Sequence, residues 1–191
     1  KRKNLMLMTG GFLIAGILFN MYYQYSYEKD YLSEFSDQGE ALDKLETGTD
    51  LAVLKTGDES VYRYDQMGTH SYENSSMQTG TNGTSYYFSV ASGDITNFFN
   101  EVDLNTPWDY HYENLDSRTI LDRLAAVKYF VVKAGEEEYL PYGYDTLAAE
   151  AEKKDRLYRA YECKNALPIG YTYDSYIPEK KYAKMSTVEK Q

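Results

Sequence analysis

A long polar stretch holds the residues that are best suited to bind a ligand. From Gln66 to Ser92 the chain is rich in Gly, Ser, Thr, Asn and Tyr and has few aliphatic side chains, which is typical of loops. A loop of this length inside a compact domain is usually functional or disordered. Gly80 and Gly83 allow another group to approach the backbone closely. We therefore predict that Asn74–Ser89 lines a ligand-facing surface.

Aromatic, polar and guanidinium side chains in and beside this stretch suit a sugar or a phosphate group. Tyr86, Tyr87 and Phe88 offer flat rings for stacking. Arg63 and Arg118 lie on either side of the stretch, and a guanidinium group binds phosphate through a bidentate fork that Lys lacks. The candidate ligand-binding residues are Arg63, Asn74, Ser75, Tyr86, Tyr87 and Arg118.

The two arginines also admit a purely structural interpretation. Arg63 has Asp65 two residues away, and Arg118 has Asp116 two residues away. Each guanidinium group could therefore form an ion pair within the fold and make no contact with a ligand. Substitution by Lys separates the two interpretations, because Lys keeps the charge and loses the bidentate geometry.

A metal site is a further hypothesis, and it rests on Trp108–Glu113. This segment alternates aromatic and polar residues, so Asp109, His111 and Glu113 would share one face of an extended chain. Such a set could bind a divalent cation. The favoured interpretation is a solvated polar face opposite packed rings, so we assign no metal ligand and no cofactor.

No familiar catalytic arrangement is visible. The chain has no Gly-rich phosphate loop that opens a helix, no Ser-His-Asp grouping and no Cys-His metal spacing. A glycosidase needs a pair of carboxylates, and spacing singles out no pair among the 30 acidic residues. The catalytic residues therefore stay unassigned.

Composition limits the class of partner. The net charge of -10 argues against nucleic acid. The single cysteine, Cys163, has no partner for an internal disulfide. The 22 tyrosines suit strands, interfaces and sugar stacking, although the simpler interpretation is that most are strand and core residues.

The stretch Leu5–Tyr23 has the length and composition of a membrane-spanning helix. It is nearly continuously apolar, and it approaches the roughly 20 residues that cross a bilayer. Lys1, Arg2 and Lys3 precede it, and positive residues favour the cytoplasmic side. A signal peptide would have a shorter apolar core and a small-residue cleavage site, and a buried soluble helix would have a polar face. We predict a cell-membrane helix with the rest of the chain outside.

The remaining elements predict an α+β fold, because strand and helix signals interleave without a βαβ rhythm. Residues 1–24 form the transmembrane helix, 25–58 a helical stalk and connector, and 59–191 an extracellular domain with a mixed sheet. The predicted strands are Ser60–Asp65, Lys128–Lys133, Leu157–Glu162 and Ile169–Ile177, with helices Ile95–Val102 and Ser117–Val127 packed against them. Thr146–Lys154 is predicted as an exposed helix and Leu51–Lys55 as a turn.

Five sequence blocks together carry a family resemblance. They are ESVYRYDQ, ENSSMQTGTNGTSYYFSV, LDSRTILDRLAAVKYFVV, LPYGY and NALPIGYTYDSYIPEKKYAKMSTVEKQ, and they cover most of Glu59–Gln191. Their order and spacing resemble the YfhO family of bacterial membrane proteins. Each block alone is weak evidence for the family, whereas the combination of the five blocks is specific for it.

The resemblance implies a polytopic membrane protein similar to GT-C glycosyltransferases. Such enzymes take sugar from a polyprenyl-phosphate donor, and YfhO-like proteins are linked to glycosylation of lipoteichoic acid in Gram-positive bacteria. Their acidic catalytic residue sits in an early extracytoplasmic loop, which we do not find here. The capping box Ser186–Glu189 and the missing initiator Met suggest a piece of a longer polypeptide. The alternative is a membrane-anchored carbohydrate-binding or structural module with no catalytic role.

Overall fold

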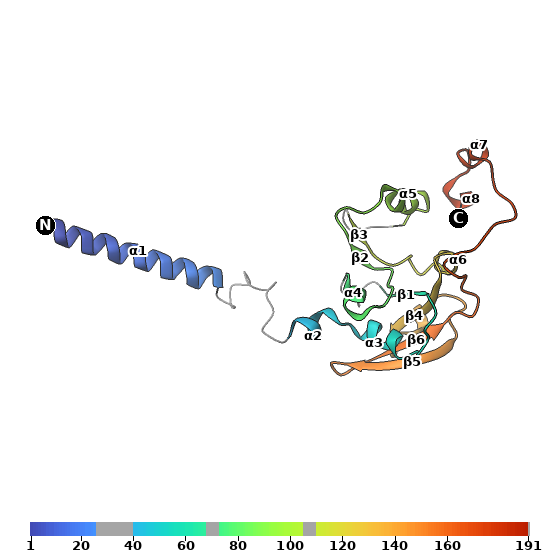
Figure 1. Cartoon of the computed structure of the whole chain (residues 1–191), viewed down its shortest axis with the longest axis horizontal. Helices are drawn as coiled ribbons and strands as arrows, with labels where there is room; N and C mark the ends of the chain where they lie inside the picture. Colours follow the sequence, from blue (N-terminus) through green and yellow to red (C-terminus); the bar gives the residue numbers. More distant parts are fainter. Residues whose placement is uncertain (26–39, 68–72, 105–109, 191) are drawn as a thin grey trace. The chain divides into compact units, whose positions relative to one another are not determined.

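The computed structural model describes residues 1–25, 40–67, 73–104 and 110–190 (Figure 1). The chain divides into two compact units, Lys1–Ala41 and Leu42–Gln191. Residues 26–39 of the predicted helical stalk and connector lie outside the described residues, as do Trp108 and Asp109 of the metal hypothesis.

The first unit contains one long apolar helix, α1 (Arg2–Tyr25), in which no residue is buried. Its 24 residues would extend about 36 Å at 1.5 Å per residue, which is enough to cross the hydrocarbon core of a bilayer. The Thr9 hydroxyl donates to the Leu5 carbonyl at 3.0 Å, so this polar group is satisfied within the helix. By length and composition, α1 is the one membrane-span candidate among the described residues.

The second unit is built on a mixed four-stranded sheet. Its strands are β1 (Arg63–Gln66), β4 (Val127–Lys133), β6 (Arg156–Glu162) and β5 (Thr146–Lys153), in the order β1-β4-β6-β5. β1 runs parallel to β4, and the other neighbours are antiparallel. A separate antiparallel pair joins β2 (Tyr86–Tyr87) to β3 (His111–Tyr112). The predicted α+β fold is confirmed, and three of the four predicted strands belong to the main sheet.

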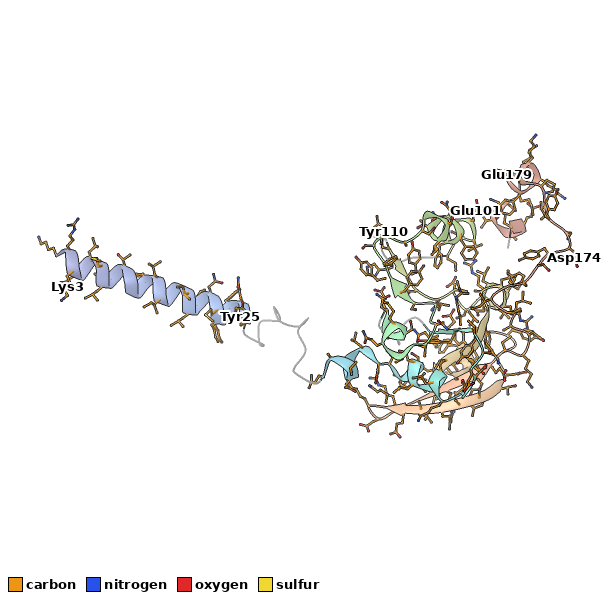
Figure 2. All side chains as sticks on the ribbon, in the orientation of Figure 1. Lys3, Tyr25, Glu101, Tyr110, Asp174 and Glu179 are labelled. Carbon is orange, nitrogen blue, oxygen red and sulfur yellow. The ribbon has the colours of Figure 1, made fainter. Side chains whose placement is uncertain are left out.

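The chain also contains short helices. They are α2 (Ala41–Leu45), α3 (Gly48–Leu54), α4 (Ser75–Thr79), α5 (Gly93–Glu101), α6 (Thr119–Leu124), α7 (Glu179–Tyr182), α8 (Thr187–Lys190) and the 3₁₀ helix η2 (Glu137–Tyr139). Of these, α3, α6 and η2 contact the main sheet. The Glu101 carboxylate ties α5 to the C-terminal helices, because it accepts from Lys190 Nζ at 2.6 Å and from the Tyr182 hydroxyl at 3.2 Å (Figure 2).

The central strand β4 explains why the run KYFVV is almost continuously apolar. Phe130 and Val132 join one core cluster, which includes Phe99, Val102 and Leu121 from the regions of α5 and α6. Tyr129 and Val131 join a second cluster with α3 residues. Because both faces of β4 are covered, both sets of side chains must be apolar. α6 contacts β4, as predicted, whereas α5 places the ring of Phe99 against Tyr112 of β3.

Two secondary-structure predictions are wrong, and the first is wrong because tertiary pairing overrides local propensity. Thr146–Lys154 is not a helix: Thr146–Lys153 is β5, paired along its length with β6. The turn residues Lys154 and Asp155 have φ of 50° and 59°, as a type I′ hairpin requires. Ile169–Ile177 is not a strand, and this segment lies exposed on the surface.

Two helix boundaries also differ from the prediction. The turn predicted at Leu51–Lys55 is the second half of α3, which begins at Gly48 after the N-cap Thr47. Thr47 and Asp50 form a capping box, in which the Thr47 hydroxyl accepts from the Asp50 amide at 3.3 Å. The helix predicted at Ser117–Val127 is shorter: α6 starts after Arg118, which makes no side-chain cap bond, and it ends at Leu124.

Candidate functional site

A pocket of about 420 Å³ opens beside the start of β1. We call it the aromatic pocket. It is bounded by α4, by the segment that precedes β2, and by β2 itself. Its lining residues are Arg63, Asn74, Ser76, Met77, Thr81, Asn82, Gly83, Tyr86, Tyr87 and Phe88. Four of the six predicted ligand-binding residues, Arg63, Asn74, Tyr86 and Tyr87, are brought together here.

Asn74 fixes the wall of the aromatic pocket. Its φ of 64° lies in the left-handed region, which Asn tolerates better than most residues. Its side-chain amide donates to the Tyr87 carbonyl at 2.9 Å and accepts from the Tyr87 amide at 3.1 Å. The side chain of Asn74 therefore pairs with Tyr87 as a neighbouring strand would, which holds β2 in place.

The pairing of β2 with β3 orients the aromatic rings. Tyr86 stacks on Tyr112 with ring centroids 4.8 Å apart, and burial raises the pKa of Tyr86. Tyr87 lies against the His111 ring at 4.6 Å and keeps 42% of its surface exposed. Phe88 is 54% exposed, and its amide donates to the Tyr110 carbonyl at 3.1 Å. Tyr110 directly precedes β3, at the margin of the β2–β3 pair (Figure 2). Tyr87 and Phe88 thus present ring surface to a ligand.

His111 takes part in a polar pair next to the pocket. Its Nδ1 lies 2.6 Å from Oε1 of Glu73, the residue that precedes Asn74. Among the described residues, no group of three or more His, Cys, Asp or Glu side chains could hold a metal ion. The Glu73 carboxylate that lies beside His111 belongs to the chain that leads into α4.

Arg63 is the cationic group among the described lining residues of the aromatic pocket. One guanidinium nitrogen donates to the Ala125 carbonyl at 2.7 Å, which anchors the side chain on the loop before β4. A register irregularity between Arg63 and Tyr64 accompanies this anchoring. The anchored guanidinium group leaves other N–H donors for an anionic or hydroxyl-bearing ligand.

Ser75 lies behind the pocket wall. It is 2% exposed and is not among the lining residues. Below it, the Tyr64 hydroxyl donates to the buried Asp50 carboxylate, which also accepts from the Thr81 hydroxyl at 3.3 Å. Burial and the nearby Asp50 charge raise the pKa of Tyr64. This network supports the pocket from the core side.

Arg118 lies elsewhere, at the C-terminal end of α5. Its guanidinium group donates to the Val102 carbonyl at 2.6 Å and the Asp103 carbonyl at 2.7 Å, and it reaches the Asp116 carboxylate at 3.3 Å. Terminal carbonyl groups of a helix have no partner within the helix, so these bonds cap α5. This geometry matches the structural interpretation of Arg118, including the ion pair with Asp116.

Arg118→Lys is expected to destabilise the second unit and to leave the aromatic pocket intact. A Lys ammonium group cannot hold both carbonyl groups in the fork that Arg provides. Loss of one charge-assisted bond corresponds to about 1–2 kcal/mol of unfolding free energy at this partly buried position. Urea unfolding measures the change, and Arg156→Lys at an exposed position serves as the control. Equal stability of Arg118→Lys and the unsubstituted chain would contradict the capping role.

Several lining residues fall inside the predicted stretch Asn74–Ser89 but were not among the candidate ligand-binding residues. Ser76 and Met77 belong to α4, whose five residues give little helical signal inside a polar stretch. Asn82 and Gly83 lie beside β1 through a parallel bridge between Tyr64 and Gly83. The close approach is visible at Gly83, where an added Cβ would lie 3.2 Å from the Tyr64 ring. The sequence could indicate that Gly83 allows a close approach, but it could not indicate that the approaching residue is Tyr64 of β1.

Comparison with known proteins identifies the family and gives no closer relative. No match is found among curated proteins or among solved structures. The family described as "Bacterial membrane protein YfhO" matches residues 2–191, which is almost the whole chain. Together with the membrane-span candidate α1, this match shows that the chain belongs to the YfhO family of bacterial membrane proteins.

Proposed function

We propose that the second unit is an extracytoplasmic domain that helps transfer sugar from a polyprenyl-phosphate donor to a cell-envelope polymer. The polymer is of the lipoteichoic acid type found in Gram-positive bacteria, and the chemistry resembles that of GT-C glycosyltransferases. Lys1, Arg2 and Lys3 favour a cytoplasmic N-terminus, which would put the second unit on the outer face.

The observation that carries this proposal is the chemistry of the aromatic pocket. Exposed faces of Tyr87 and Phe88 suit the apolar face of a sugar ring, and Asn82 and Arg63 supply hydrogen-bonding groups. Its described lining residues include no carboxylate that could act as a general acid or base. The pocket therefore suits binding and positioning, with catalysis supplied by another part of the protein.

The same observation favours a second candidate function. A membrane-anchored carbohydrate-binding module also needs a sugar pocket without catalytic acids. The two functions differ in one result: a transferase component is required for polymer glycosylation in cells, whereas a binding module is not.

Tyr87→Ala is expected to weaken binding of the ligand about tenfold or more. Removing the ring deletes a stacking surface whose burial contributes about 1.5–3 kcal/mol, and each 1.4 kcal/mol is a factor of ten. Arg63→Lys is expected to weaken binding as well, because Lys keeps the charge and loses the fork. Both variants should fold, since neither side chain is fully buried. The measurements are polymer glycosylation in cells and saccharide binding by the purified full chain.

The matched control is Tyr139→Ala, which removes a comparably exposed ring from η2, outside the described pocket lining. All three variants must reach the membrane at the same level. Normal glycosylation together with lost binding would favour the binding module over the transferase component. Normal glycosylation and unchanged binding in Tyr87→Ala and Arg63→Lys would refute the pocket assignment.

A further inference from the structure

A second, smaller pocket adjoins the aromatic pocket. It has a volume of about 160 Å³, and we call it the acidic pocket. Its lining residues are Val53, Leu54, Asp58, Glu59, Ser60, Tyr62, Gly80, Thr81 and Asn82. Thr81 and Asn82 line both pockets, so the two cavities share this short segment as a wall.

The shared segment is held firmly in position. The Thr81 hydroxyl bonds to the Thr79 hydroxyl at 2.9 Å and to the buried Asp50 carboxylate at 3.3 Å. The Asn82 carbonyl accepts from the Tyr64 amide at 3.0 Å, and its side-chain amide donates to the Tyr62 carbonyl at 3.1 Å. The side chain of Asn82 is exposed, and its amide oxygen makes no bond within the part of the chain that the structure describes. That oxygen is available to a ligand that passes from one pocket to the other.

The two pockets differ in chemistry. The aromatic pocket offers ring faces and the Arg63 guanidinium group, whereas the acidic pocket offers carboxylates and hydroxyls. Asp58 is already engaged, because its carboxylate accepts from Lys128 Nζ and from the Tyr129 hydroxyl at 2.9 Å. Burial raises the pKa of Asp58, but the bonds from Lys128, Ser60 and Tyr129 outweigh it and lower the pKa overall.

Glu59 is the carboxylate left for a ligand in the acidic pocket. Its side chain is exposed and has no ion pair or hydrogen bond among the described residues. A carboxylate only accepts hydrogen bonds, so this end of the site suits a unit that donates from hydroxyl groups. Glu59 lines the acidic pocket and Arg63 lines the aromatic pocket, with the bend at Ser60 between them in the sequence. A ligand that contacts both side chains must therefore reach from one cavity into the other across Thr81 and Asn82.

We propose that the two pockets are adjacent subsites of one groove that binds a linear oligosaccharide of at least two units. One unit stacks on Tyr87 and Phe88, the chain crosses Thr81 and Asn82, and the next unit donates hydroxyl groups to Glu59. This inference rests on the proposed function, and it adds that the ligand is a polymer segment and not a single sugar.

The test measures how affinity depends on ligand length. The full chain in lipid nanodiscs is titrated with glucose, galactose and N-acetylglucosamine, each as the monomer and as linear oligomers of two, three and six units. At least one series is expected to bind, and its oligomers should bind at least tenfold more tightly than the monomer. Glu59→Gln weakens the second subsite, and Ser60→Phe fills it. In both variants the oligomers should bind no more tightly than the monomer, and the affinity for the monomer should be unchanged.

Two controls test whether the effects of Glu59→Gln and Ser60→Phe are specific to the acidic pocket. Glu138→Gln makes the same chemical change at an exposed site outside the described lining of both pockets, and it should keep the gain. Protection of the buried Cys163 thiol from labelling reports that Ser60→Phe is folded. The groove proposal would be wrong if monomer and oligomers bound the unsubstituted chain equally well. It would also be wrong if both variants still bound oligomers more tightly than the monomer. Either result would leave the assignment of the aromatic pocket unaffected. Failure of every saccharide to bind would overturn the proposed function and this inference with it.

Discussion

Asp122→Asn is expected to stabilise the second unit at alkaline pH and to make its unfolding less dependent on pH. Asp122 lies in α6 with none of its surface exposed, and neither carboxyl oxygen has a hydrogen-bond donor among the described residues. Burial and the adjacent negative charge of Asp65 raise its pKa to about 9. The folded protein therefore keeps a proton on Asp122 at neutral pH.

Asp65 is the partner that carries the charge. Its carboxylate accepts from the Gln66 amide at 2.7 Å, the Thr84 hydroxyl at 2.8 Å and the Leu115 amide at 3.0 Å. Burial raises the pKa of Asp65 as well, and these three donors oppose that effect. Asp122, which lacks such donors, keeps the proton and donates it to Asp65.

The sign of the pH effect follows from the proton count. Between the unfolded pKa near 4 and the folded pKa of about 9, the folded state binds one more proton at Asp122 than the unfolded state. The stability contributed by this proton is fully present below pH 4 and is lost as the pH rises towards 9. The loss is about 1.4 kcal/mol per pH unit, or about 4 kcal/mol between pH 5 and pH 8. An Asn amide can donate to Asp65 without titrating.

Urea unfolding of the detergent-solubilised chain at pH 5, 6.5 and 8 measures this effect. The difference in unfolding free energy between Asp122→Asn and the unsubstituted chain cancels the titrating groups that do not contact Asp122, and it should grow steadily with pH. Asp65→Asn is the matched control, because its amide would face three donors and should destabilise at every pH. A difference for Asp122→Asn that does not change with pH would show that Asp122 is ionised in the fold.

Gly48→Ala is expected to destabilise the second unit by about 1–3 kcal/mol, the usual cost of overpacking a core. Gly48 is the first residue of α3, and the ring of Tyr158 in β6 lies directly over it. An added Cβ would lie 2.0 Å from Cδ2 and 2.1 Å from Cε2 of that ring. Tyr158 is only 6% exposed, so the ring cannot move without disturbing the second core cluster.

Gly93→Ala is the matched control for Gly48→Ala. Gly93 is also the first residue of a helix, α5, and follows a Ser N-cap as Gly48 follows a Thr N-cap. An added Cβ at Gly93 meets nothing within 4 Å. Gly93→Ala should therefore be neutral or slightly stabilising, because Ala favours a helix more than Gly does.

The rate at which a thiol reagent labels Cys163 measures how each substitution changes stability. This thiol is buried, so we expect it to react only when the fold opens. Gly48→Ala should speed labelling at least fivefold, and Gly93→Ala should not. The double variant Gly48→Ala with Tyr158→Leu should recover part of the loss, since the smaller side chain leaves room. Similar labelling of the two single variants would mean that the ring of Tyr158 does not restrict Gly48.

Sequence alone determined the features that depend on composition and local pattern. The apolar run Leu5–Tyr23 predicted α1, because length and hydrophobicity suffice for a spanning helix. The run KYFVVK predicted a buried strand, and the spacing of Ile95, Phe98 and Phe99 predicted α5, because each pattern reflects which faces are covered. The family resemblance was also readable from the order of the five blocks.

Only the tertiary structure decided which distant groups meet. Thr146–Lys153 has the composition of a helix, yet it is a strand because β6 supplies a partner along its whole length. Arg63 and Arg118 look alike in the sequence. One lies in the aromatic pocket and the other caps α5, because the carbonyl groups they bind come from different parts of the chain. The burial of Asp122 against Asp65 likewise depends on contacts between residues far apart in sequence, which no local pattern encodes. The same holds for the two pockets that share Asn82 as a lining residue.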